Sequence, residues 1–437
     1  MPLFIVLAAI ILLVLLVTWC RLNTFLSFLI VSILMGLALH MDVTAITQSI
    51  QTGIGKTLGS LIVVIVFGSM LGKLVAESGA GQKIAGALMQ LLGPRYVQWS
   101  LMLTGFIVGI PLFYNIGFVL MVPLIFTVAA STGLPVVYLG IPMLAALSVT
   151  HGYLPPHPSP TALVQQFHAN MGLTLVYGIL VAIPAIILAG PVFSRFLKHY
   201  TTTPGKMFVT APLPEAQLPG LLVSLFTALL PVLLLAGTAL LRLWVPPDAG
   251  YFRIITWLGD PLIVMLLAVL NGICFLGLRK QTPMKKVMGM MDEAVRDVAV
   301  IILIIGGSGA LTQLLHDSKV SEYIAVTLRN MQLHPLLLAW GIAAIIRVCI
   351  GSATVAGLTT AGIVAPLIPG SGVNPSLMVL ATGAGSLMFS HVNDAGFWMF
   401  KEYFNLSVKD TIKTWSVMET IVSVTGLAGC LILNLFV

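Results

Sequence analysis

Charged residues are scarce in this sequence. Only 8% of its 437 residues are Asp, Glu, Lys or Arg, and 58% are hydrophobic, whereas about 25% of the residues of an average soluble protein are charged. This composition excludes a soluble fold. Cysteine is scarce as well, and the cysteines lie in apolar segments without a C-x-x-C motif, which argues against a disulfide framework and a zinc site. They are Cys20, Cys274, Cys349 and Cys430.

The sequence also lacks the common motifs of catalysis. It contains no Walker loop, no G-x-S-x-G elbow and no H-E-x-x-H zinc motif. We therefore expect no enzyme activity, no metal site and no cofactor, and we expect any transport to draw on an ion gradient and not on ATP. A membrane-embedded enzyme or a passive channel is the alternative from another functional class.

Apolar segments of membrane-spanning length follow one another along the whole chain. A bilayer core about 30 Å thick takes about 20 apolar residues per helix, and no separate polar domain interrupts the series. The sequence therefore predicts an all-α polytopic membrane protein whose first apolar run is retained as a span. The predicted spans are 3–20, 24–40, 57–77, 136–170 (interrupted), 172–194, 218–244, 258–278, 297–316, 375–405 (interrupted) and 411–436.

Two further pairs of apolar pieces are short for ordinary spans. Residues 97–112 with 116–131, and 335–350 with 353–369, are pieces of about 16 residues joined by a polar or glycine-containing tip. We expect each pair to form a re-entrant hairpin.

Basic residues outnumber acidic ones, 21 to 14, which gives a formal net charge of +7. They lie in loops between apolar spans, so we interpret them as determinants of membrane orientation and expect no nucleic-acid partner. Most of them fall on the cytoplasmic side if the N-terminus is outside. This predicts a multi-pass protein of the cytoplasmic (inner) membrane with both termini on the outer, periplasmic side.

An internal repeat is visible when residues 71–88 are aligned with residues 311–328. With a six-residue slip, Pro155–Pro160 also falls on Phe389–Asp394. The matching spans run in opposite directions, and inverted repeats with matching broken helices are typical of secondary transporters. Chance similarity among Leu-, Ala- and Gly-rich helices is the alternative. The coincident pairs are Leu71/Leu311, Leu74/Leu314, Glu77/Asp317, Ser78/Ser318, Ile84/Ile324, Ala85/Ala325 and Leu88/Leu328.

The repeat predicts five parts. They are N-terminal scaffold helices at 1–56; a first inverted repeat at 57–196, with a hairpin at 97–131 and a broken helix at 136–170; a cytoplasmic linker at 197–217; central scaffold helices at 218–296; and a second inverted repeat at 297–437, with a hairpin at 335–369 and a broken helix at 375–405.

Polar interruptions lie at membrane depth at Phe113–Asn115, Pro155–Thr161, Gly351–Thr354 and Ser390–Asp394. Non-helical backbone is tolerated there only when it is buried in protein or lines a cavity, so we expect the interruptions to converge. The half-helices that follow them have positive N-terminal ends, which suit a carboxylate. An extramembrane loop is the alternative for the proline-rich run.

Ionisable residues in these interruptions are candidates for function, because charge at membrane depth is expensive. Asp394 is interpreted as a proton-binding carboxylate, as the cap of the following half-helix, or as both. His391 would share its helical face, and His157 is either functional or a hydrogen-bonded structural histidine. Arg347 is either a partner for a substrate carboxylate or the counter-ion of Asp394, with a snorkelled side chain as a third possibility.

Neutral polar side chains in the same segments suit a polyhydroxylated ligand, although Ser and Thr in membrane helices often bond their own backbone instead. The candidate substrate-binding residues are Tyr114, Asn115, His157, Ser159, Thr161, Arg347, Ser352, Thr354, His391 and Asn393. The candidate proton-coupling residues are Asp394, His391 and His157.

The motifs at 154–158, 351–356 and 390–398, together with Lys401–Leu406, resemble the gluconate permease (gluconate:H+ symporter) family of the ion-transporter superfamily, and the similarity runs along the whole chain. The resemblance implies uptake of gluconate, idonate or a related sugar acid with protons across the cytoplasmic membrane. It also implies a scaffold and an elevator-like transport domain with two opposed hairpins, and a homodimer.

Two positions depart from the family pattern. Asn115 follows the aromatic pair where the gluconate and idonate members carry Glu, and Ser159 replaces the usual Gly. These differences leave other transport hypotheses open. They are a transporter of another small hydroxy acid or amino acid, such as glycerate or D-serine, and a sodium-coupled carboxylate transporter.

Overall fold

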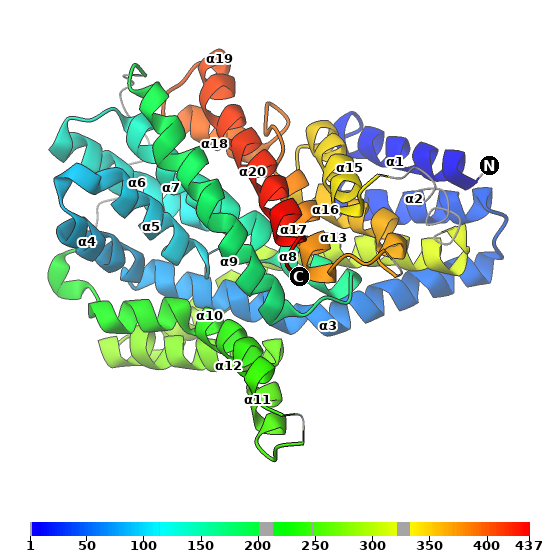
Figure 1. Cartoon of the computed structure of the whole chain (residues 1–437), viewed down its shortest axis with the longest axis horizontal. Helices are drawn as coiled ribbons and strands as arrows, with labels where there is room; N and C mark the ends of the chain where they lie inside the picture. The colour runs from blue at the N-terminus through cyan, green and yellow to red at the C-terminus, as the bar shows by residue number, and fades with distance from the viewer. Residues whose placement is uncertain (1, 113, 201–212, 247, 321–332, 370) are drawn as a thin grey trace.

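A computed structural model of the protein describes residues 2–112, 114–200, 213–246, 248–320, 333–369 and 371–437. Over these ranges the chain is helical and has no strand (Figure 1). Five helical segments are long and apolar enough to cross a membrane, or seven if each of two bent helix pairs is one span. The predicted all-α membrane fold is confirmed.

The helices before residue 200 are α1 (Pro2–Thr18), α2 (Thr24–Ala38), α3 (Val43–Glu77), α4 (Ala80–Leu92), α5 (Val97–Gly109), α6 (Tyr114–Thr132), α7 (Val136–Tyr153), α8 (Pro158–Gln166) and α9 (Met171–Ile187). Those after it are α10 (Leu221–Trp244), α11 (Phe252–Leu258), α12 (Pro261–Gly272), α13 (Met284–Asp317), α15 (Pro335–Ile350), α16 (Ala353–Val364), α17 (Pro375–Gly385), α18 (Ala395–Tyr403), α19 (Val408–Thr411) and α20 (Val417–Leu433). Short helical turns are η1 (Pro94–Tyr96), η2 (Leu188–Val192), η3 (Arg195–Leu197), η4 (Glu215–Gln217), η5 (Ile273–Gly277), η6 (Leu278–Lys280), η7 (Ala365–Leu367) and η8 (Ile412–Ser416).

The two longest helices, α3 and α13, pack against each other in opposite directions. At one end Ser49 Oγ donates to Asp317 Oδ2 over 2.6 Å, and near the other Lys73 Nζ lies 3.0 Å from Glu293 Oε2. Glycines keep the helices close between these contacts, as is common in membrane proteins. A Cβ atom on Gly53 would lie 2.3 Å from the backbone oxygen of α13's Gly309.

Both helices begin well before the predicted spans 57–77 and 297–316, and α3 is bent by 44° between Gly59 and Leu61. The predicted domain boundaries stay predictions. Polar residues in the first turns of each helix concealed these earlier starts. Helix α4 lies between the predicted span 57–77 and the predicted hairpin piece 97–112, where no helix was predicted. Its buried residues Ala80, Gly81, Ile84 and Ala85 follow a helical period, whereas Gln82 and Lys83 between them are partly exposed.

The segments predicted as broken helices form α7 with α8 and α17 with α18, and their breaks cover residues 154–157 and 386–394. Helices α7 and α17 are almost entirely buried. They meet at Gly152 and Gly383, each near the C-terminal end of its helix, where a Cβ atom on Gly383 would lie 2.3 Å from the Gly152 backbone oxygen. The two breaks therefore begin next to each other in the core.

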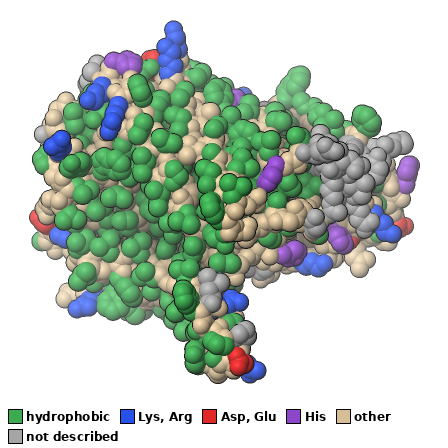
Figure 2. Space-filling model, viewed as in Figure 1, with side chains coloured by type: hydrophobic (Ala, Val, Ile, Leu, Met, Phe, Trp, Pro, Cys, Tyr) green, Lys and Arg blue, Asp and Glu red, His purple; other side chains and the backbone are tan. Residues whose placement is uncertain are grey.

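Apolar side chains also cover much of the outer surface. Figure 2 shows hydrophobic residues across most of one face, with Lys and Arg mainly near its margins. Helices α10 and α12 pack side by side at the lower edge of Figure 1, and α12 packs against α3. This surface is consistent with a protein that contacts lipid over a broad belt.

Helices α5 and α6, and α15 with α16, occupy the ranges predicted as hairpins. That they re-enter the membrane, that the halves are inverted repeats and that a transport domain moves on a scaffold stay predictions. Phe113, residues 201–212 of the predicted linker, and the repeat positions Ile324, Ala325 and Leu328 lie outside the described residues.

Candidate functional site

The break before α18 is hydrogen-bonded to the end of α15. His391 Nε2 donates to the carbonyl of Val348 over 2.9 Å. Asn393 Nδ2 donates to the same carbonyl over 2.8 Å and to that of Cys349 over 3.2 Å. Gly351, at the hairpin tip, has φ +81°, and a Cβ atom there would lie 2.2 Å from the Asn393 backbone oxygen. Only glycine fits this tip.

Arg347 and Asp394 form a buried ion pair between the same two elements. Nη2 of Arg347 lies 2.5 Å from Oδ2 of Asp394, and the side chains are 4% and 18% exposed. Arg347 Nη1 also donates to the carbonyl of Gly351, while its buried Nε has no hydrogen-bond partner. Asp394 caps α18 by accepting from the Gly396 N–H over 3.0 Å, and it accepts from the Ser390 hydroxyl. Asp394 is therefore both the counter-ion of Arg347 and the N-cap of α18.

Tyr114 joins this region to the first half of the chain. Trp415 Nε1 donates to Ser390 Oγ over 2.7 Å, and the Tyr114 ring centroid lies 6.1 Å from that of Trp415. The Tyr114 ring also faces the start of α18, because a Cβ atom on Gly396 would lie 3.6 Å from it. The first residue of α6 thus contacts the second broken helix.

The first break contains a comparable histidine contact. His157 Nε2 donates to the carbonyl of Gly109, at the end of α5, over 2.8 Å. In each half, a histidine from the broken helix therefore binds the C-terminal end of the first helix of the hairpin pair. His151 lies between this histidine and Tyr114, with ring centroids 5.4 Å from His157 and 5.9 Å from Tyr114.

Buried hydroxyls without hydrogen-bond partners lie where α8 packs on α16. Ser159 and Thr161 are 2% and 0% exposed, and neither hydroxyl has a partner. Ser159 Oγ faces α16, because a Cβ atom on Gly357 would lie 3.3 Å from it. Thr359 of α16 carries a further buried hydroxyl without a partner. Buried polar atoms normally have partners, so these donors suit a ligand.

Three of the predicted substrate-binding residues give less support to a ligand site. Ser352 is used as the N-cap of α16 and accepts from the Val355 N–H over 3.4 Å, and Thr354 is half-buried in the first turn of that helix. Asn115 is the second residue of α6, and its side chain lies outside the described part of the structure.

The structure adds Glu419 and Ser148, which the sequence analysis did not identify. Glu419, in the first turn of α20, is 2% exposed. Ser148 of α7 donates its hydroxyl to Glu419 Oε1, and Oε2 has no partner. The buried Tyr114 hydroxyl lies near Ser148 and within electrostatic range of Glu419, but it makes no hydrogen bond of normal geometry. The available signal was that Glu419 is the single acidic residue of the predicted span 411–436.

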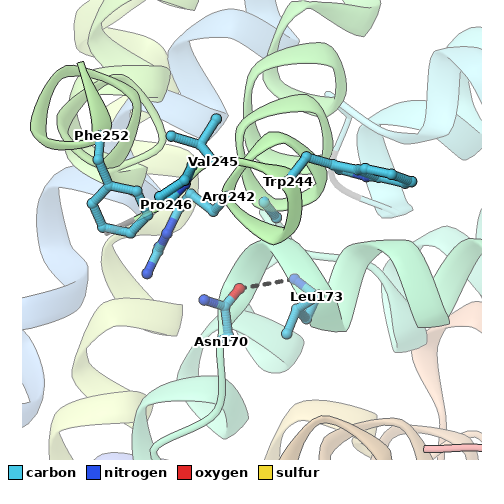
Figure 3. A pocket seen from close by; sticks show the side chains of 8 residues that line it. Asn170, Leu173, Arg242, Trp244, Val245, Pro246 and Phe252 are labelled. Carbon is cyan, nitrogen blue, oxygen red and sulfur yellow. Dashed lines mark hydrogen bonds between the residues drawn. The ribbon is translucent and has the colours of Figure 1, made fainter. Parts of the chain in front are cut away.

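A separate open pocket of about 450 Å³ lies between the start of α9 and the end of α10 (Figure 3). Arg242 lies in it, 5.7 Å from the Phe252 ring centroid, and Asn170 lies on the opposite side, where it caps α9. The lining includes none of the predicted site residues.

A family model described as "GntP family permease" matches residues 1–436. The chain belongs to the GntP permease family. Such proteins are permeases, so this member is a membrane transporter and not an enzyme. The chain is 47% identical to a high-affinity gluconate transporter and 44% identical to the Gnt-II system L-idonate transporter, both of Escherichia coli K12, and 42% identical to a gluconate permease of Bacillus subtilis 168. These alignments cover 99–100% of both proteins.

Solved structures share the fold of this family member at low sequence identity. The YdaH transporter of Alcanivorax borkumensis superposes with a TM-score of 0.67 at 19% identity, covering 94% of this chain and 96% of that one. MtrF of Neisseria gonorrhoeae gives 0.62 at 16% identity, covering 91% and 86%. At these identities the likeness shows the fold alone.

Proposed function

We propose that the protein is a secondary active transporter that imports gluconate or a related sugar acid together with protons across the cytoplasmic membrane. The observation that carries this proposal is a buried cation with an unused donor, Arg347 Nε, with the unpartnered hydroxyl of Tyr114 within electrostatic range of it. The names of the gluconate and idonate relatives support the same substrate class.

The chemistry of the site matches a polyhydroxylated carboxylate. Arg347, whose charge is balanced by Asp394, can donate its free Nε–H to the carboxylate. The N-terminal ends of α8, α16 and α18 add partial positive charge. The hydroxyls of Tyr114, Ser159 and Thr161 are buried without partners and are available to the hydroxyl groups of a sugar acid. Each hydrogen bond restored on binding is worth about 1 kcal/mol, and somewhat more when it involves the charged group.

Transport then requires that the site open alternately to each side of the membrane. The bonds that tie the break before α18 to the end of α15 support movement of these elements as one unit. The elevator-like transport domain, the homodimer and the outer position of the termini belong to the same proposal.

The experiment is uptake by proteoliposomes of radiolabelled gluconate, with unlabelled L-idonate, glycerate, D-serine and glucose as competitors at an acidic and a neutral outer pH. We expect competition by the sugar acids and none by neutral glucose, which lacks the carboxylate that Arg347 binds. Strong competition by glycerate or D-serine, with none by sugar acids, would refute the substrate class. Uptake that follows sodium and ignores pH would refute the proton coupling.

A further inference from the structure

Glu419 is a buried carboxylate that has no role in the transport scheme proposed so far. The inference about Glu419 rests on that proposed function. Helix α20 packs against α7, α9, α15 and α17. Within the described residues, the carboxylate accepts one hydrogen bond, from Ser148 on the almost fully buried helix α7. Oε2 is buried without a partner. A carboxylate in this position is costly as an anion and much less costly as a neutral acid.

Charged and titratable groups face Glu419 from several elements. Those within electrostatic range are Tyr114 of α6, Tyr153 of α7, Arg347 of α15 and Asp394 at the start of α18. Helices α9 and α17 contain no charged residue, and Lys413 of the adjoining turn η8 is exposed. His151 lies one turn after Ser148 on α7, and its buried Nδ1 has no hydrogen-bond partner. Among these groups of the described residues, Arg347 is the one permanent cation.

The residues predicted to bind protons already have partners. Asp394 accepts from Arg347, Ser390 and the N–H of Gly396, so its protonation would break an ion pair. The histidines His391 and His157 each use Nε2 on a backbone carbonyl. Glu419 differs, because one of its two oxygens is unoccupied and its ionised form has a single donor.

The charge balance then links Glu419 to an anionic substrate. Arg347 is neutralised by Asp394 in the structure, so a bound carboxylate would add a net negative charge to the buried region. An ionised Glu419 would be a second uncompensated negative charge, and like charges in a shared low-dielectric site strongly disfavour each other. Substrate binding and ionisation of Glu419 therefore oppose each other.

We propose that Glu419 carries the coupled proton. One O–H bond forms at Oε2 with a proton from the outer water when the anionic substrate binds. The same bond breaks, and the proton passes to the inner water, after the substrate leaves on the cytoplasmic side. The hydroxyl of Ser148 holds Oε1 and keeps Oε2 available. One proton accompanies one substrate carboxylate, so the loaded site crosses the membrane without added charge.

The test is the dissociation constant of gluconate, measured by calorimetry on the full-length protein in lipid nanodiscs between about pH 5 and about pH 9. At the alkaline end, wild-type affinity should fall about tenfold per pH unit, because one proton is taken up per substrate. Glu419→Gln keeps the shape and the acceptor for Ser148 but cannot ionise. Its affinity should be independent of pH and close to the wild-type value at acidic pH.

Glu402→Gln is the matched control, because Glu402 is exposed on α18 and pairs only with Lys401 in the described contacts. Its affinity should vary with pH as in the wild type. A Glu419→Gln protein that retains the tenfold slope, or that is folded and binds no gluconate at acidic pH, would overturn the proposal. Wild-type protein that binds no sugar acid would refute the proposed function instead.

Two measurements keep the proposal testable if binding is weak or the Gln variant does not fold. The infrared spectrum of the wild type should show a protonated carboxyl band that disappears as pH rises, and Glu419→Gln should lack this band. Ser148→Ala keeps the carboxylate and removes the donor to its anion, so the binding curve should keep its slope and move to higher pH. An unshifted curve, or an infrared band retained in Glu419→Gln, would contradict the assignment.

Discussion

Replacement of Asp394 by Asn separates its ion pair from its capping role. Asn caps helices as well as Asp does, so the bond to the N–H of Gly396 should survive. The interaction with Arg347 should not, because an amide carries no charge to balance the guanidinium. Breaking a fully buried pair costs about 3–5 kcal/mol. Since Asp394 is 18% exposed whereas Arg347 is 4% exposed, we expect the lower end, about 3 kcal/mol of unfolding free energy.

The assay is urea-induced unfolding of the purified protein in detergent, followed by tryptophan fluorescence. Asp260→Asn is the matched control, because Asp260 caps α12 through the Leu262 N–H over 2.9 Å and is exposed. The control should stay within about 0.5 kcal/mol of wild type. If Asp394→Asn unfolds at the same urea concentration as the control, Asp394 does not stabilise the protein through Arg347.

A double-mutant cycle with Arg347→Met tests the pairing directly. Removal of both charges leaves no uncompensated buried ion, so the double variant should be more stable than the sum of the single losses implies. If the losses of unfolding free energy are additive, Arg347 and Asp394 do not stabilise the protein as an ion pair. In Asp394→Asn protein that folds, gluconate binding should still weaken as pH rises, because Glu419 is intact.

Two further predictions concern the carboxylate partner and the contact between broken helices. Arg347→Lys should weaken gluconate binding about tenfold, roughly 1.4 kcal/mol, because lysine lacks the planar fork of arginine. The control Arg253→Lys, at an exposed position, should bind gluconate as the wild type does. Equal affinities of the two variants would show that Arg347 does not bind the substrate. Gly383→Ala should cost about 1–3 kcal/mol of unfolding free energy, since its Cβ would meet the Gly152 carbonyl. In the control Gly341→Ala, the new Cβ meets nothing within 4 Å, so no stability should be lost. Similar stabilities of the two variants would show that α7 and α17 are not closely packed at Gly152 and Gly383.

Local chemistry explains what the sequence predicted well. Proline lacks an N–H and restricts the residue before it, so the break before α8 followed from Pro155, Pro156 and Pro158 alone. The capping role of Asp394 was among the predictions for the same reason, because a cap involves neighbours in the chain. The alternatives for Arg347 stayed open, since the pairing with Asp394 depends on how α15 meets a segment 47 residues away.

Contacts between distant segments explain what the sequence did not predict. Ser148 and Glu419 are 271 residues apart, and nothing near either residue specifies the partner. The donation from His157 to Gly109 depends on the tip of another helix pair. Helix α4 was missed because Gln82, Lys83 and Gln90 interrupt its apolar residues, so it has no apolar run of membrane-spanning length.

The most direct test of the central claim is accumulation of labelled gluconate by proteoliposomes with an acidic exterior and a neutral, sodium-free interior. Proton-coupled import predicts that internal gluconate rises above the external concentration, peaks and returns to equilibrium when a protonophore collapses the gradient. Equal internal and external concentrations throughout, with no effect of the protonophore, would contradict the account.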